Sequence, residues 1–165
     1  MWDKDELSRI YSRQAETVYR VCYMFVKNPH DAEDMTHNAF VKLMNGSSVA
    51  FENAEHEKAW LIRAAANICK DFLKSAWAKR TDIPETHPAP QKPENEALRQ
   101  VLAMPDRYKI PIYLFYYEGY KTDEIAKMLG KPASTVRGLL HRGRKILKIE
   151  MEEKYNGKER ADIGV

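Results

Sequence analysis

Four of the chain's eight prolines lie between residues 84 and 93, and this cluster limits the fold more than any other feature of the sequence. Each proline lacks a backbone N–H donor and pushes the preceding residue toward an extended conformation, so no helix can run through the cluster. Apolar residues recur at helical spacing on both sides of it. We therefore expect two small helical domains, one over residues 1–80 and one over residues 96–155. Residues 81–95 are the expected linker between them, and residues 156–165 an expected frayed tail.

Neither flank of the proline cluster contains a convincing alternating strand. In the first 80 residues, apolar side chains follow helical spacing over 18–26, 35–44 and 61–73. The first of these stretches stops before Pro29, and Asp31 is expected to cap the helix that follows. The predicted fold class is all-α.

Composition excludes several classes of protein. With 165 residues and 44% apolar side chains, the chain can bury a real core. No apolar run approaches the roughly 18 residues of a spanning helix, and the polar, acidic start is unlike a secretory signal peptide, so we expect a cytoplasmic protein without membrane insertion. Cys22 and Cys69 are interpreted as buried, reduced thiols, with a redox-sensitive Cys69 as the less favoured hypothesis.

The C-terminal half carries the pattern of a helix–turn–helix over residues 122–148. Thr122 is expected to cap its first helix, and Gly130 to end that helix in a left-handed conformation. The second helix is predicted to begin near residues 132–134. Before this motif, the apolar stretch 108–117 contains Pro111, which is expected to bend the helix or to mark its start. Small and apolar residues stand at the offsets that two crossing helices require.

The second helix of this motif has a basic outer face. Between Lys131 and Lys148 there are six Lys or Arg residues and no acid. Arg137, His141 and Arg144 share one stripe with Lys148, because their spacings are four, three and four residues. Arginine can pair with guanine edges or with phosphates, so the pattern favours DNA binding over a merely solvated basic helix.

These blocks together resemble the extracytoplasmic-function group of bacterial sigma factors, from about Ile10 to Lys148. Met104-Pro-Asp-Arg-Tyr, the Tyr-Tyr-Glu-Gly-Tyr of 116–120 and Ser134-Thr-Val-Arg are similar to region 4 of that family. Asp31-Ala-Glu-Asp with Ala39-Phe, and the stretch from Phe51 to Lys74, are similar to region 2. The two blocks occur in the family's order, with a linker between them.

The resemblance implies a function and a set of partners. The chain would bind core RNA polymerase, recognise the −35 element as duplex and the −10 element as single-stranded DNA, and direct transcription initiation. An anti-sigma factor is a further expected partner. No cofactor, metal or catalytic residue is expected, because the polymerase performs the chemistry.

The resemblance also implies roles for particular residues. The residues expected to contact core polymerase are Asp31, Glu33, Asp34 and Asn38. The loop from about 46 to 57 and the helix from Lys58 to Lys74 are expected to take the −10 element, with contacts from Lys58, Trp60, Arg63, Asn67 and Lys70. Those expected at the −35 element are Ser134, Thr135, Arg137, Gly138, His141, Arg142, Arg144 and Lys145.

The sequence departs from the family pattern at two places. His37-Asn38 stands where Gln-Glu is common, and Gly138-Leu139 stands where Ser-Arg is common. The second departure removes one expected base contact, and it puts the promoter preference in doubt.

Other interpretations compete with these roles. Trp60 at helical spacing is first of all a candidate core residue. Asp34 and His37 have the spacing of a helical metal site, but the second copy and the further glutamates are missing. His56-Glu57 begins like a zinc-protease motif that Trp60 interrupts. The alternatives for the whole chain are a helix–turn–helix regulator that works without polymerase, and a helical metalloenzyme.

Overall fold

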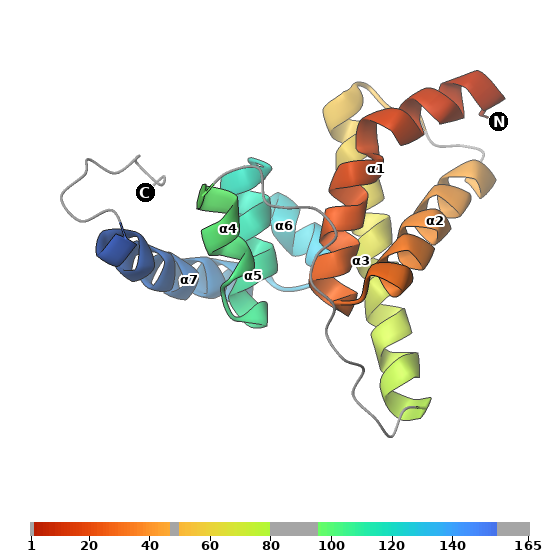
Figure 1. Cartoon of the computed structure of the whole chain (residues 1–165). Helices are drawn as coiled ribbons and strands as arrows, with labels where there is room; N and C mark the ends of the chain where they lie inside the picture. The colour runs from red at the N-terminus through yellow and green to blue at the C-terminus, as the bar shows by residue number, and fades with distance from the viewer. Residues whose placement is uncertain (1, 47–49, 80–95, 155–165) are drawn as a thin grey trace. The chain divides into compact units, whose positions relative to one another are not determined.

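The computed structural model describes residues 2–46, 50–79 and 96–154, and these residues form helices and short connections without a strand (Figure 1). The all-α prediction is therefore confirmed. The chain divides into two compact units, residues 1–90 and 91–165. The predicted linker at 81–95 and the predicted tail at 156–165 lie outside the described residues.

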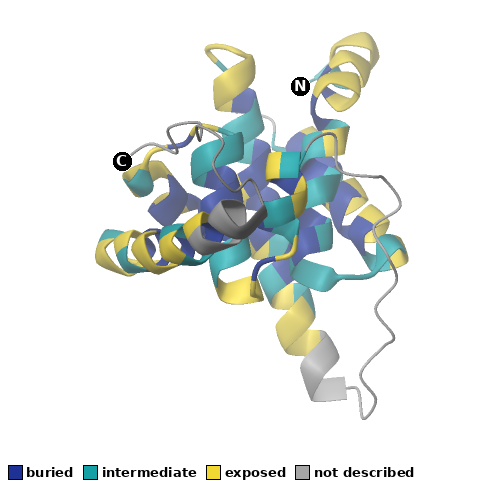
Figure 2. Cartoon of the chain, turned by 60° about the vertical axis from the view of Figure 1, so that its left-hand side comes forward, coloured by how far each residue is buried: buried dark blue, intermediate teal, exposed yellow. Residues whose placement is uncertain are grey.

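The first unit is a bundle of three helices, each of which packs against the other two. These are α1 (Lys4–Val26), α2 (Pro29–Asn45) and α3 (Ala54–Lys79). Figure 2 shows that their buried faces point toward one another, with the exposed faces outside. Fully burying one such aliphatic side chain contributes about 1.5–3 kcal/mol. The core side chains that all three helices supply include Ile10, Val18, Cys22, Ala32, Met35, Ala39, Leu43, Leu61, Ala65 and Cys69.

The first two helices are capped by side chains that stand just before them. Asp3 accepts hydrogen bonds from the backbone N–H groups of Asp5 and Glu6, at 2.6 and 3.2 Å. Asn28 caps α2 by accepting a bond from the N–H of Asp31 at 3.0 Å. The prediction that Asp31 is the cap was wrong. Asp31 lies inside the first turn of α2, where the positive end of the helix dipole stabilises its carboxylate.

The second unit is arranged around its last helix. It contains α4 (Glu96–Leu102), α5 (Asp106–Ile112), the π-helical turn η1 (Tyr113–Tyr117), α6 (Thr122–Leu129) and α7 (Ala133–Lys154). Helix α7 packs against α4, α5 and α6. The buried residues of this unit include Leu98, Val101, Ile110, Ile112, Tyr113, Leu114, Ile125, Met128, Leu129, Val136, Leu140 and Leu147.

Pro111 lies inside α5, and the helix changes its winding directly after it. The residues from Tyr113 onward form a π turn, in which the N–H of Glu118 reaches back five residues to the carbonyl of Tyr113 at 3.1 Å. Proline removes one helical N–H donor and crowds the preceding turn, so a wider turn nearby accommodates it. The helix begins at Asp106, and the predicted irregularity takes the form of this π turn.

The helix–turn–helix has the predicted stop but a different start. Gly130 ends α6 in the left-handed conformation, with φ of 65°. Helix α6 begins at Thr122 and is preceded by Lys121, whose N–H donates to Glu124 Oε1 at 2.9 Å. The prediction that Thr122 is the N-cap was wrong, because Thr122 is the first helical residue and Lys121 stands in the N-cap position, where the Glu124 carboxylate accepts its N–H.

Gly143 is where α7 comes closest to α5. A Cβ atom at this position would lie 2.7 Å from Ile112 Cγ1, 2.9 Å from Ile112 Cδ1 and 3.4 Å from Tyr108 Cβ. Gly138, one and a half turns earlier, faces only the guanidinium of Arg142, at 3.5 Å. At position 143 the packing against α5 therefore leaves no room for a side chain, whereas at position 138 the space would accept one.

We predict opposite effects for alanine at these two glycines. Gly143→Ala lowers the stability of the second unit by about 1–2 kcal/mol, because the overlap with Ile112 outweighs the gain in helix propensity. Gly138→Ala raises stability by up to about 1 kcal/mol, because only the propensity changes. All three tryptophans precede residue 78. Urea unfolding followed by far-UV circular dichroism, compared with tryptophan fluorescence, therefore separates the two units. A Gly143→Ala protein as stable as wild type would contradict the close packing.

Candidate nucleic-acid interface

Helix α7 buries one face and turns a basic face to solvent. Val136, Leu139, Leu140, Gly143 and Leu147 are buried against the rest of the unit. The residues expected at DNA that are exposed on the other side are Ser134, Thr135, Arg137, His141, Arg142 and Lys145. Two further candidates, Gly138 and Arg144, are half-buried. The buried face thus fixes which side chains a DNA duplex could meet.

The first turn of α7 offers backbone donors beside these side chains. A helix leaves the N–H groups of its first turn without intrahelical acceptors. In α7, the N–H of Val136 donates to the carbonyl of Pro132 at 3.2 Å, and the exposed residues Ser134 and Thr135 precede it. This arrangement suits a phosphate group, because the N–H groups and the helix dipole both favour a negative charge.

The departure at Gly138-Leu139 has a structural explanation. Leu139 is buried in the core and does not reach the outer face. Arg142 lies over Gly138, where a Cβ atom would lie 3.5 Å from the guanidinium Nη2. The guanidinium therefore covers the part of the outer surface that a side chain at position 138 would occupy.

A second candidate surface lies on α3. Trp60, Arg63, Asn67 and Lys70 recur at spacings of three, four and three residues, so they share one stripe of the helix. Arg63 and Asn67 are exposed, and Trp60 and Lys70 are half-buried. This stripe combines an aromatic ring with cationic and amide side chains. Such a mixture suits single-stranded DNA, because bases stack on rings and cations follow the backbone.

Lys58 does not belong to this stripe. It lies about 160° around the helix from Trp60, on the side that faces the core. Its side chain is largely covered, and its Nζ atom lies 3.3 Å from Glu55 Oε2. Helical spacing alone would have separated Lys58 from the other four residues.

Phe51 connects the segment before α3 to the stripe. Its ring centroid lies 5.6 Å from that of Trp2 in a stacked geometry, and 5.4 and 6.0 Å from those of His56 and Trp60 in edge-on geometries. Trp2 and Trp60 also pack against the core of the first unit. Trp60 is thus both a core-packing residue and a member of a half-buried aromatic group. The loop expected at the −10 element includes Phe51 and His56, although neither was named individually, and Trp2 was not predicted to belong to it; an aromatic residue within an otherwise polar segment was the available signal.

The acidic candidates on α2 divide into two groups. Asp31, Asp34 and Asn38 share one stripe by their spacing, and Asp34 and Asn38 are exposed. Asp34 Oδ2 lies 3.7 Å from His30 Nε2 at the surface. Burial, and then the carboxylate of the exposed Glu33, raise the pKa of Tyr19 on α1. The stripe is therefore a carboxylate-bearing surface on the second helix.

The described part of the chain holds no group of three or more side chains arranged to bind a metal. His56 and Glu57 are both engaged elsewhere. His56 Nδ1 accepts the N–H of Glu52 at 3.2 Å, and Glu57 is bound to Arg13. Likewise, none of the described helices is long and apolar enough to cross a membrane.

Two family models cover most of the chain. Residues 10–79 match the model of sigma-70 region 2, and residues 94–147 match the model of sigma-70 region 4. The chain is 25% identical over 172 residues to the ECF RNA polymerase sigma factor SigW of Bacillus subtilis (strain 168), covering 92% of this chain and 91% of that protein. It is 30% identical over 139 residues to the RNA polymerase sigma factor SigV of the same organism, covering 81% and 83% respectively.

A solved structure shows the same fold. It is that of the sigma factor RpoE in complex with the anti-sigma factor NepR from Bartonella quintana, with a TM-score of 0.64. The match covers 94% of this chain and 98% of that chain, at 16% sequence identity.

The two cysteines lie in the core on the opposite side of α3 from the stripe. Cys22 and Cys69 are both completely buried, which confirms that part of the prediction. A hydrogen bond with Cys22, and then burial, raise the pKa of the Cys69 thiol above its ordinary value. Only the thiolate is a good nucleophile, so these surroundings oppose a redox-sensitive Cys69.

We predict that both thiols are protected from modification in the folded protein. The raised pKa of Cys69 means less thiolate at any given pH than in the unfolded chain. Labelling with a chromogenic disulfide reagent between pH 7 and 9 should therefore be at least about 100-fold slower without urea than in it, since it requires the core to open. Rapid labelling of the folded protein at pH 7 would contradict this.

Proposed function

The chain belongs to the sigma-70 family, as an RNA polymerase sigma factor of the extracytoplasmic-function group, and we propose that its two units bind the two elements of a promoter through the surfaces described above. As a sigma factor it binds core RNA polymerase and directs transcription initiation. The observation that carries the residue-level proposal is the division of α7, over residues 133–148, into a buried apolar face and an acid-free basic face.

In the second unit, α7 is the helix that enters the major groove of the −35 element. Arg137, His141 and Arg142 reach base edges, since they lie on its exposed face. Ser134 and Thr135 at its first turn bind a phosphate, and Lys145 contacts the DNA backbone. Gly138 lets Arg142 lie flat over the helix. Arg144, which is half-buried, contributes chiefly to the positive field of this face.

In the first unit, the α3 stripe receives the −10 element. Arg63, Asn67 and Lys70 follow the single strand, and Trp60 together with Phe51 offers ring surface to unstacked bases. Stacking on an aromatic ring is worth about 1–3 kcal/mol per base, which offsets part of the cost of opening the duplex. Lys58 supports the start of α3 through Glu55 and is not assigned a DNA contact.

The exposed face of α2 binds core polymerase. Asp34 and Asn38, with Asp31 beside them, present a carboxylate-rich surface that complements a basic partner surface. Glu33 lies at the edge of this surface, toward Tyr19. In this proposal the polymerase supplies the chemistry, and the chain acts in the cytoplasm without catalytic residues or a cofactor of its own.

An anti-sigma factor is the proposed regulator. The support is that RpoE of Bartonella quintana, which shares this fold, was solved in complex with the anti-sigma factor NepR. Occlusion of the α7 and α3 surfaces would block both promoter contacts at once. The alternative of a polymerase-independent regulator is disfavoured, because the first unit matches sigma region 2 over residues 10–79.

We predict promoter-specific transcription that depends on α7. Bacterial core polymerase on fragmented genomic DNA of the host should produce defined start sites only when this protein is added. The variant Arg137→Ala/Arg142→Ala should reduce those transcripts by about 10-fold or more, since each base-reading arginine contributes about 1–3 kcal/mol. Run-off transcription with mapped 5′ ends measures this.

The matched control is Arg99→Ala, which removes an exposed positive charge from α4 of the same unit. It should leave the transcripts within about twofold of wild type, because it changes the net charge but no groove contact. Equal losses in the control and the double variant would refute the assignment of base contacts to α7. The absence of any start site with wild-type protein would refute promoter recognition itself.

A further inference from the structure

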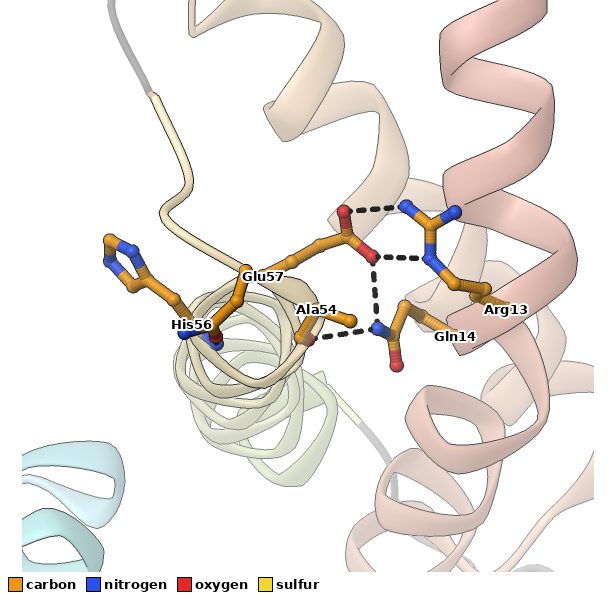
Figure 3. A network of polar contacts seen from close by, with 6 residues as sticks. Arg13, Gln14, Ala54, His56 and Glu57 are labelled. Atoms are coloured by element: carbon orange, nitrogen blue, oxygen red, sulfur yellow. Dashed lines mark hydrogen bonds and ion pairs between the residues drawn. The ribbon is translucent and has the colours of Figure 1, made fainter.

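Glu57, in the first turn of α3, is a buried carboxylate held by two residues of α1 (Figure 3). Arg13 donates to it twice, from Nε to Oε1 at 3.2 Å and from Nη2 to Oε2 at 2.9 Å. Gln14 Nε2 donates to Oε1 at 2.9 Å and also to the carbonyl oxygen of Ala54 at 3.1 Å. Glu57 and Gln14 are only 4% and 5% exposed. We call Arg13, Gln14 and Glu57 the Glu57 network.

This network fixes the start of α3 against α1. An ionised carboxylate that is removed from water needs charge-assisted partners, and a two-bond arginine contact accepts only a narrow range of orientations. The amide of Gln14 bonds both to the carboxylate and to the backbone of the same turn. The first turn of α3 therefore cannot shift along or rotate against α1 without leaving a buried charge unpaired.

The segment just before α3 is attached to that same turn. The carbonyl of Asn53 accepts the N–H of Glu57 at 3.1 Å, and Asn53 Oδ1 accepts the N–H of His56 at 2.8 Å. His56 Nδ1 in turn accepts the N–H of Glu52 at 3.2 Å. The ring of Phe51 packs edge-on against that of His56. Residues 51–57 thus form one connected piece whose position depends on Glu57.

We propose that Glu57, held by Arg13 and Gln14, is a positioning residue that presents Phe51 and the segment 51–56 in the arrangement that accepts an unstacked base of the −10 strand. The inference rests on the proposed role of the first unit at the −10 element. The network lies behind the aromatic surface and need not touch DNA. The network orders residues 51–56 before the DNA strand binds, so the free energy of binding is not reduced by the entropic cost of ordering them.

The double variant Arg13→Met/Glu57→Leu tests this proposal. Apolar residues of similar size can replace a buried ion pair with little loss of stability, because both charges disappear together. The three bonds from α1 to the Glu57 carboxylate are lost all the same, and only the bond from Gln14 to the carbonyl oxygen of Ala54 remains. A merely structural network predicts normal DNA binding in this variant, whereas a positioning network predicts a loss.

The readout is the affinity of the holoenzyme for a fluorescent single-stranded oligonucleotide that carries the −10 sequence of a mapped start site, measured by anisotropy. All proteins are compared about 20 °C below their own unfolding midpoints. We expect the double variant to bind the oligonucleotide at least about fivefold more weakly than wild type. Its affinity for core polymerase should be unchanged.

Ile10→Ala is the matched control, since Ile10 is a core residue of α1 outside the network. It lowers stability by removing apolar core contacts while it leaves every hydrogen bond of the Glu57 network in place, and it should bind the oligonucleotide like wild type. Wild-type affinity in the double variant, or an equal loss in Ile10→Ala, would overturn the positioning role. If the wild-type holoenzyme does not prefer the −10 oligonucleotide to a scrambled one, the proposed function of the first unit is wrong as well.

Discussion

The close contact between α7 and α5 at Gly143 is the constraint on which the second unit depends. Because Ile112 and Tyr108 lie where a side chain at position 143 would begin, α7 has one rotational position in which it can pack. That position buries Val136, Leu140 and Leu147 on the same side. Helical geometry then turns Arg137, Arg142, Lys145 and Lys148 to solvent, while Arg144 is half-buried. One packing contact therefore sets the orientation of the proposed DNA-reading surface.

In the first unit, an ion pair has a comparable role. The apolar core brings three helices together, but apolar contacts are not directional. The bonds from Arg13 and Gln14 to Glu57 are directional, and they act on the turn that carries residues 51–56. The unit thus combines a core that supplies most of the stability with a buried polar contact that determines a local shape. The aromatic rings around Phe51 belong to the segment whose position this polar contact determines.

The sequence was sufficient where the determinants are local. Helical periodicity predicted the all-α class and the buried face of α7, and Gly130 ends α6 as expected because a left-handed residue is a local requirement. The caps at Asp31 and Thr122 were wrong, because several side chains near a helix start can compete for the free N–H groups. Contacts between distant residues were out of reach: Arg13 with Glu57, and Trp2 with Phe51, are separated by more than 40 positions and show no pattern in one sequence.

The most direct test is a cryo-electron microscopy structure of this protein with core RNA polymerase and one of its promoters. We predict α7 in the major groove of a double-stranded −35 element, with Arg137 and Arg142 at base edges. We also predict an unpaired −10 base against Phe51 and a single strand along Arg63 and Asn67. A −10 segment that stays double-stranded along α3, or an α7 whose basic face is turned away from the duplex, would contradict these assignments.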